Sequence, residues 1–184
     1  MTSLRGRLLV AAPSLADPNF ARAVVLVLDH GPDGAVGIVL NRPSDAAVAD
    51  PLPAWRDVVA EPRVLFVGGP VAGDTAIGLG AAATGSEDGG FDPLDVDVGV
   101  GTVDLSRDPS EVPLEELRVF CGYAGWSEGQ LESELAEGSW VVAAVTPQDD
   151  VFGADPDELW ARVLRRQPGR VAWLAGCPAD VSSN

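Results

Sequence analysis

Short apolar runs separated by turn residues fill the first 40 positions, and they constrain the fold more than any other feature. The runs Leu8–Ala12, Val24–Leu28 and Ala35–Leu40 have the length and aliphatic content of strands. The last two are joined by Gly31-Pro32-Asp33-Gly34, which is a turn sequence. Because so short a connection makes neighbouring strands antiparallel, we predict a hairpin over residues 24–40.

The rest of the chain adds more strands than helices. Extended segments are predicted at 64–67, 76–79, 96–103, 118–121, 140–145 and 171–175. A short helix is predicted at 54–60, a second one after Ser127, and a third with Asp155 as its cap and Gly169 at its end. Eight or nine strands and three helices, without regular alternation, indicate an α+β fold.

The length and composition indicate one domain. A chain of 184 residues has a common size for a single domain, so we assign residues 1–184 to one unit. An acidic segment at about 84–92 has little to bury, and we expect it to be a mobile loop. The last residues, about 178–184, are expected to form a C-terminal tail.

The charge balance excludes several classes of function. The chain has 28 acidic and 12 basic residues, a formal net charge of −16, and every basic residue is arginine. The absence of lysine excludes a lysine Schiff base and a phosphate-binding P-loop. Since nucleic-acid affinity comes largely from neutralising phosphates, the acidic excess disfavours direct nucleic-acid binding.

The remaining totals favour a cytoplasmic protein that binds no membrane. No apolar run approaches the roughly 18 residues of a membrane span, and Leu8–Ala12 is shorter than the roughly 7–15 residues of an export core. Cys121 and Cys177 could form at most one disulfide. His30 is the only histidine and has no matching ligand pair, so we predict no metal site and no cofactor.

The stretch from Gly122 to Leu135 suggests chemistry most strongly. Gly125-Trp126-Ser127-Glu128-Gly129 fits the Gly-x-Ser-x-Gly frame of a nucleophile elbow, between a predicted strand and a predicted helix. However, hydrolases that use this elbow place their histidine after the serine, and His30 precedes it. A serine hydrolase using Ser127 is therefore kept only as an alternative.

The same stretch can also be explained as the start of a helix. With Ser127 as the N-cap, Gln130 completes a capping box, and Trp126 and Leu131 form a hydrophobic staple. Gly138 would then close the helix in the left-handed conformation. This interpretation leaves Tyr123, Gly129 and Glu132 unexplained, and a glycine in a first helical turn suggests close approach by a ligand or another backbone.

Several separated motifs, in order, resemble the YqgE/AlgH family of bacterial proteins. They are Gly6-Arg-Leu-Leu-Val-Ala-Ala-Pro-Ser-Leu15, Asp17-Pro-Asn-Phe20, Asp29-His30, Gly37-Ile-Val-Leu-Asn41-Arg42-Pro43, Gly68-Gly-Pro-Val71 and Gly122-Tyr-Ala-Gly-Trp-Ser-Glu-Gly-Gln-Leu-Glu132. The resemblance implies a mostly antiparallel sheet curled like a barrel, with about three helices packed outside. It implies no established reaction, although the AlgH name carries a proposed role in transcriptional regulation of alginate production. The family commonly has glycine where this chain has Ser127, which further weakens the hydrolase hypothesis.

We therefore expect a binding or regulatory module without enzymatic activity, which takes an unknown small molecule or protein. Asn41-Arg42-Pro43 is either a turn in which Asn41 bonds nearby backbone, or a place where Arg42 offers its guanidinium to an anion. The alternative to a simple binding module is a transcriptional regulator that acts through a protein partner. The candidate ligand-binding residues, expected together at one end of the barrel, are Asn41, Arg42, Gly69, Pro70, Tyr123, Gln130 and Glu132.

Overall fold

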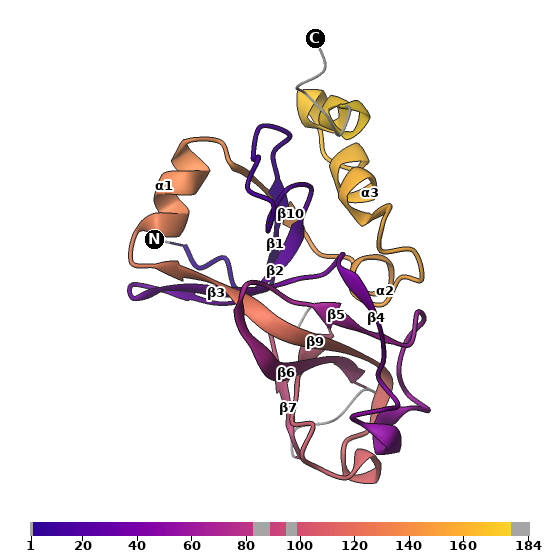
Figure 1. Ribbon diagram of the computed structural model, residues 1–184. Coiled ribbons are helices and arrows are strands. Elements are labelled where there is room, and N and C mark those ends of the chain that lie inside the picture. The colour runs from indigo at the N-terminus through magenta and orange to yellow at the C-terminus, as the bar shows by residue number, and fades with distance from the viewer. Residues whose placement is uncertain (1, 83–88, 95–98, 178–184) are drawn as a thin grey trace.

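The computed structural model of the chain describes residues 2–82, 89–94 and 99–177 (Figure 1). Its strands are β1 (Arg7–Ala11), β2 (Val24–Gly31), β3 (Gly34–Val39), β4 (Pro43–Ala47), β5 (Val64–Val67), β6 (Val71–Ala82), β7 (Phe91–Pro93), β8 (Val100–Val103), β9 (Leu114–Ser127) and β10 (Trp140–Ala144). The α-helices are α1 (Gln130–Ala136), α2 (Pro147–Asp150) and α3 (Leu159–Arg165). Three 3-10 helices complete the description: η1 (Pro53–Trp55), η2 (Pro109–Glu111) and η3 (Gly169–Gly176).

The described strands form one curled sheet in the order β10-β1-β2-β3-β9-β6-β8-β7. Neighbours along this path are antiparallel, while β5 pairs with β4 on one side and runs parallel to β9 on the other. The result is a half-barrel, so the α+β class and the mostly antiparallel, barrel-like sheet are confirmed. The hairpin predicted over residues 24–40 is formed by β2 and β3.

The sheet is buried on both faces where β1 and β2 lie. Leu8 and Val10 of β1 belong to the cluster beneath α3, whereas Leu9 and Ala11 belong to the cluster beneath α1. Trp160 of α3 donates its indole N–H to the Ala11 carbonyl at 2.8 Å, which ties this helix to the sheet. Figure 1 shows α1 on one side of these strands and α3 on the other. Burial on both faces explains why these strands are uninterrupted apolar runs and do not alternate with polar residues.

Strand β9 is the longest element and belongs to both halves of the sheet. Its pairing with β6 runs from Leu114 to Tyr123, and its residues 124–127 pair with β3. The change of partner occurs around Gly122, whose φ is +76°. The strand predicted at 118–121 is longer in the structure, because Tyr123 still pairs with Val71 of β6 and residues 124–127 pair with β3; the extra residues of the register shift lie on β6, between Val71 and Ala76.

The strand predicted at 171–175 is wrong. Residues 171–175 form part of the 3-10 helix η3 rather than a strand. In a helix with about three residues per turn, Val171 and Leu174 share one face, and both pack against the main core. A short apolar run does not by itself distinguish a strand from a buried helical turn.

The helix predicted at 54–60 is reduced to η1, because Val59 forms a parallel bridge with Leu117 that draws the chain into the sheet.

Helix α3 begins at Leu159 after Glu158 and is not capped by Asp155. Gly169 begins η3 and does not end α3. Arg162 and Arg165 do lie in the last turn of α3, where cations are favoured.

The predicted acidic loop at 84–92 and the predicted tail at 178–184 lie mostly or wholly outside the described residues. Within that loop, Phe91 and Asp92 belong to strand β7. Strand β4 was missed because its sequence, Pro-Ser-Asp-Ala-Ala, has no apolar alternation. Its position beside β5 at the margin of the sheet allows a polar strand that begins with proline.

Candidate binding cleft

A cleft of about 280 Å³ lies where β3, β4, β5 and the start of β6 meet. Three separate segments of the chain contribute to it: the loop after β1, the β3–β4 corner and the β5–β6 corner. The lining residues are Pro18, Asn19, Val39, Arg42, Pro43, Val67, Gly69 and Pro70. The cleft therefore brings together three of the predicted site residues, namely Arg42, Gly69 and Pro70.

Arg42 provides the cationic group of the cleft. Its Nη2 donates to the Ala21 carbonyl at 2.5 Å, and among the described residues no carboxylate lies within ion-pair distance of its guanidinium. Burial lowers the pKa of Arg42, and the charge of Asp157 opposes that effect. The guanidinium is thus held by one carbonyl and keeps further N–H groups for a ligand.

Asn41 lies behind Arg42 and serves the fold. Its Oδ1 accepts from the Val24 amide and its Nδ2 donates to the Arg22 carbonyl, both at 2.9 Å. The side chain is buried and extends the pairing of β2 with β3 by one step. Asn41 therefore fits the turn interpretation of Asn41-Arg42-Pro43, whereas Arg42 fits the anion-binding interpretation.

Gly69 and Tyr123 meet through their backbones. A Cβ on Gly69 would lie 2.2 Å from the Tyr123 carbonyl, so only glycine allows this approach. Tyr123 also pairs with Val71 across β6 and β9, and it does not line the cleft. The Gly69 amide has no hydrogen-bond acceptor among the described residues, which leaves an unpaired backbone donor on a residue of the cleft wall.

The walls of the cleft are largely apolar. Five of its eight residues are valine or proline. Val67 is 48% exposed and Val71, just beyond the corner, is 39% exposed; both are unusually open for large apolar side chains. The cleft thus combines a cation and an amide with an uncovered apolar surface.

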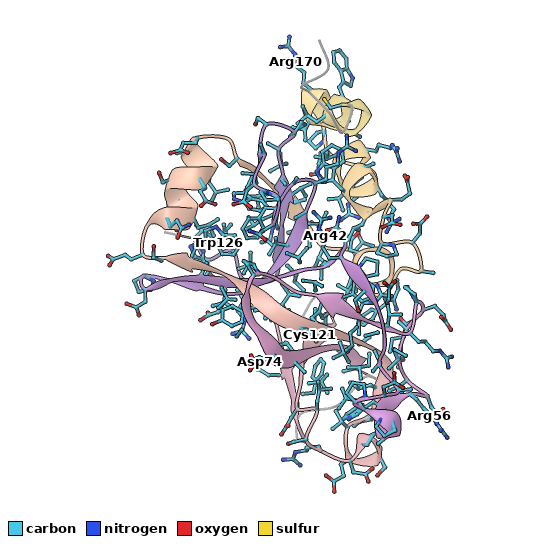
Figure 2. The ribbon with its side chains drawn as sticks, viewed as in Figure 1. Arg42, Arg56, Asp74, Cys121, Trp126 and Arg170 are labelled. Carbon is cyan, nitrogen blue, oxygen red and sulfur yellow. The ribbon has the colours of Figure 1, made fainter. Side chains whose placement is uncertain are left out.

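Gln130 and Glu132 lie elsewhere, on α1, and do not line the cleft. Figure 2 shows Trp126, which precedes this helix, well apart from Arg42. Gln130 donates to Glu134 at 3.0 Å. Glu132 accepts a 2.7 Å hydrogen bond from Nε2 of His30.

His30 and Glu132 form a pair that the sequence did not suggest. The Leu4 amide donates to Nδ1 of His30 at 3.0 Å, so the proton of the neutral ring resides on Nε2 and points to Glu132. This hydrogen bond is the main reason that the pKa of Glu132 lies below its ordinary value. Both ring nitrogens are used, so His30 is a structural residue in this arrangement.

Glu134 was also missed, although it anchors α1. Its Oε2 accepts the indole N–H groups of Trp126 at 2.9 Å and Trp140 at 2.8 Å. The two indole rings meet edge to face, and Phe20 packs against both. The sequence places Glu134 one helical turn after Gln130. This spacing alone does not show whether the carboxylate accepts buried hydrogen bonds or is exposed to solvent.

Arg118 is a second cation without a carboxylate partner, and it too was missed. It is 1% exposed and donates to the carbonyls of Glu61, Val151 and Gly153, while its guanidinium lies 4.5 Å from the centre of the Phe66 ring. Burial lowers its pKa to about 10. Unlike Arg42, Arg118 opens into no described cleft, so we assign it to the packing of the core.

The start of α1 differs from the predicted capping box. Gly129, with a φ of +72°, is the N-cap, and Ser127 is the last residue of β9. Gln130 Oε1 accepts from the amide and the hydroxyl of Ser127, at 3.1 and 3.2 Å, so only half of the box is present. No described atom would contact a Cβ on Gly129, so no other backbone approaches it closely, and the positive φ by itself accounts for the glycine.

The end of α1 is as predicted. Gly138 has a φ of +77°, and its amide bonds the Leu135 carbonyl at 3.1 Å while the Ser139 amide bonds Glu134 at 2.9 Å. These two bonds form a Schellman motif. Leu131 is buried in the same cluster as Trp126, as the staple requires.

Ser127 is not placed as a nucleophile. Among the described residues, the positive-φ residues other than glycine are Arg22 and Ala72, so Ser127 lacks the strained backbone of an elbow. Its hydroxyl bonds Gln130, whereas His30 is occupied by Leu4 and Glu132.

Both cysteines are free, and the described residues contain no cluster of three metal-ligating side chains. None of the described helices has the length and apolar character needed to cross a membrane.

Comparison with known proteins gives consistent matches over the whole length. A family described as AlgH-like (DUF179) matches residues 8–172. A UPF0301 protein of Streptomyces avermitilis is 49% identical over 100% of this chain and 97% of its own length. Another UPF0301 protein, from Thermobifida fusca, is 48% identical over 99% and 96%.

Two solved structures have the same fold. The crystal structure of protein DIP2367 from Corynebacterium diphtheriae matches with a TM-score of 0.88 and 32% identity, over 95% of this chain and 92% of that chain. The solution structure of AlgH from Pseudomonas aeruginosa matches with a TM-score of 0.69 and 28% identity, over 96% and 95%.

Proposed function

The chain belongs to the AlgH-like family, and from that premise we propose that it is a binding module without enzymatic activity, whose ligand site is the Arg42 cleft. The ligand is an anionic group on a small molecule or on a protein. The site is smaller than the set of residues predicted from the sequence, because Gln130 and Glu132 serve α1.

One observation carries this proposal. Arg42 reaches a cleft built from three distant segments, and its guanidinium meets a single carbonyl and no carboxylate among the described residues. A half-buried cation has lost part of its hydration, and an anion would restore the missing interactions. A structural role for the Arg42 guanidinium would use more of its donors within the fold, so we assign it to a binding site.

Thermal unfolding in the presence of a library of small anions tests the proposal. At about 100 times the dissociation constant, a ligand should stabilise the folded chain by about 2.7 kcal/mol, which is on the order of 5 °C or more in Tm. The Arg42→Ala variant should lose this shift. Arg56→Ala is the matched control, because Arg56 is an exposed arginine that pairs with Asp57 away from the cleft (Figure 2); an equal loss in both variants would contradict the proposal.

A regulator that acts through a protein partner is the second candidate, and the exposure of Val67 and Val71 beside the cleft favours it. Uncovered apolar side chains next to a cation are common at protein interfaces. Such a partner should co-purify with the full chain but not with Val67→Asp. Co-purification that is indifferent to Val67→Asp and Arg42→Ala would place the interface elsewhere.

A serine hydrolase at Ser127 has no support from geometry. We expect a broad panel of serine-reactive probes to leave the chain unlabelled. Labelling that disappears in Ser127→Ala would contradict this expectation and would reopen an enzymatic function.

The cytoplasmic location remains a prediction from the sequence.

A further inference from the structure

We propose that the Arg42 cleft takes one carboxylate group attached to a short aliphatic body. Both a free organic acid and the C-terminal end of a peptide with an aliphatic last residue have this chemistry. The inference rests on the proposed function, since it names the ligand class of the same cleft. It follows from the donors, the charge and the walls of the cleft.

The donors suit a group with two oxygens. Arg42 offers N–H groups beyond the one that bonds Ala21, and a guanidinium matches a carboxylate with two parallel hydrogen bonds. The side-chain amide of Asn19 lines the same cleft and has no hydrogen-bond partner among the described residues. The unpaired Gly69 amide is a third donor on the lining.

The charge of the cleft suits a monoanion better than a phosphate. Arg42 is the one cationic residue in the lining, and the nearby Asp157 offsets part of its charge. Phosphate sites generally gather several cations or a helix N-terminus to balance a charge near −2. A chain with a net charge of −16 also repels a dianion more strongly than a monoanion.

The apolar walls of the cleft indicate that the part of the ligand beyond the carboxylate is aliphatic. Val39, Val67 and three prolines surround the donors, and the half-exposed Val67 loses contact with water when an aliphatic group covers it. The volume of about 280 Å³ lies at the small end of ligand pockets, which limits the apolar body to a short chain or one side chain. A ligand with an anionic head and an aliphatic tail satisfies both parts of the lining.

An NMR titration of the ¹⁵N-labelled full chain tests the ligand class. Acetate, butyrate and hexanoate should produce saturable shifts of the Gly69 amide and the Asn19 side-chain amide. Affinity should rise along this series by up to about fourfold per methylene that becomes buried. Hexanol, hexylamine and inorganic phosphate should bind at least tenfold more weakly than hexanoate.

The source of the carboxylate is tested in a second arm. An N-acetylated dipeptide that ends in valine is compared as the free acid and as the carboxamide. Binding of both hexanoate and the dipeptide acid, but not of the carboxamide, supports the shared chemistry. Binding of only one of the two acids supports it too and identifies that source as the ligand.

Variants separate the site from effects on folding. Asn19→Ala changes an exposed side chain and should weaken hexanoate binding severalfold without changing the unfolding transition. Arg42→Lys keeps the positive charge but loses the two-pronged hydrogen bond, so it should weaken binding by at least fivefold. Arg56→Ala should bind like the wild type, because Arg56 lies away from the cleft (Figure 2).

Two negative results have different meanings. If inorganic phosphate or hexyl phosphate binds more tightly than hexanoate in an Arg42-dependent way, the carboxylate inference is overturned while the proposed binding site stands. If no anion gives saturable shifts that depend on Arg42, both the inference and the proposed function fail. The double variant Asn19→Ala/Arg42→Lys gives a further test. If hexanoate produced shifts of equal size in this variant and in the wild type, the proposed site would be overturned.

Discussion

The carboxylate of Glu132 and the imidazole of His30 hold α1 against the β2–β3 hairpin. The bond from Nε2 to Glu132 is 2.7 Å long, and the Leu4 amide fixes the other ring nitrogen. One histidine thus connects the N-terminal segment, the hairpin and the helix. The three segments meet at a residue for which the sequence suggested no partner.

We predict that the contribution of Glu132 to stability depends on pH. The hydrogen bond from His30 holds the pKa of Glu132 below its ordinary value. A carboxyl whose pKa is lowered by folding stabilises the protein above its ordinary pKa, near 4.5, and that contribution disappears as the pH falls through the lowered pKa. Denaturation at several pH values should show Glu132→Gln less stable than the wild type at pH 6, with the difference vanishing once the pH falls below the lowered pKa of Glu132.

Glu128→Gln is the control for this prediction, since Glu128 is exposed and begins the same turn without a hydrogen-bonded partner among the described residues. It should show a much smaller difference at every pH. A difference between Glu132→Gln and wild type that grows as the pH falls would contradict the geometry of the pair.

Gly122 and Gly129 both have positive φ angles, but their surroundings differ. A Cβ on Gly122 would lie 2.7 Å from the Gly69 carbonyl oxygen and 2.8 Å from that of Val71, whereas no described atom lies within 4 Å of a Cβ on Gly129. Gly129→Ala should therefore lose only about 1–2 kcal/mol through backbone strain. Gly122→Ala should lose clearly more, and equal losses in urea denaturation would contradict the close approach of the two strands.

Three of the eight residues that line the cleft were predicted as site residues from the sequence. Arg42, Gly69 and Pro70 were selected because they belong to two motifs that resemble the family, Asn41-Arg42-Pro43 and Gly68-Gly69-Pro70. Asn19 and Val67 were not selected, since a loop amide and a strand valine acquire their role only when the β5–β6 corner meets the loop after β1. Gln130 and Glu132 were chosen for their polarity, and side-chain partners on other elements account for them.

At the scale of the elements, the side chain of Glu134 stabilises the packing of α1 more than the residues of its first turn do. Trp126 and Trp140 are almost fully buried and donate to the same carboxylate oxygen. In Glu134→Ala both indole N–H groups would lose their acceptor, which should cost about 2–3 kcal/mol. Glu137→Ala on the same helix removes only an exposed contact with Ser133 and should cost less than about 0.5 kcal/mol.

Denaturation followed by near-ultraviolet circular dichroism checks this prediction, because the signal reports the packing of the tryptophans. Glu134→Ala should lower the midpoint and weaken the native signal, while Glu137→Ala should do neither. Similar midpoints for the two variants would show that the indoles find other acceptors.

The elements that could be predicted are those whose burial is uniform. Strands β1, β2 and β3 lie largely in the core, so their apolar runs define them. Strand β9 was predicted only over residues 118–121, because the glycines after Cys121 interrupt its apolar run although the pairing continues to Ser127. Residues 171–175 became a 3-10 helix because their partner is the α3 face of the core rather than a strand edge.

At the scale of the whole molecule, four of the twelve arginines lie between residues 162 and 170, and Arg165 and Arg166 among them pair with carboxylates. Arg166 makes two short hydrogen bonds to Asp150, and Arg165 lies 3.7 Å from Glu158. Figure 2 places Arg170, a residue of η3, at the tip of the molecule. A net charge of −16 makes the chain as a whole poorly suited to binding phosphates.

We therefore predict no retardation of duplex DNA in gel shifts even at about 20 mM salt, where electrostatic binding is strongest. A retarded band that weakens steeply with salt would contradict this prediction. Loss of such a band in Arg170→Ala would locate the contact at the η3 end.

The shared strand β9 also determines how the molecule can open. Since β9 supplies pairing to β3 as well as to β5 and β6, neither half of the sheet has a complete set of neighbours without it. Amide protons of β2 and of β6 should therefore exchange with deuterium through the same global event, at similar rates, and not through separate local openings.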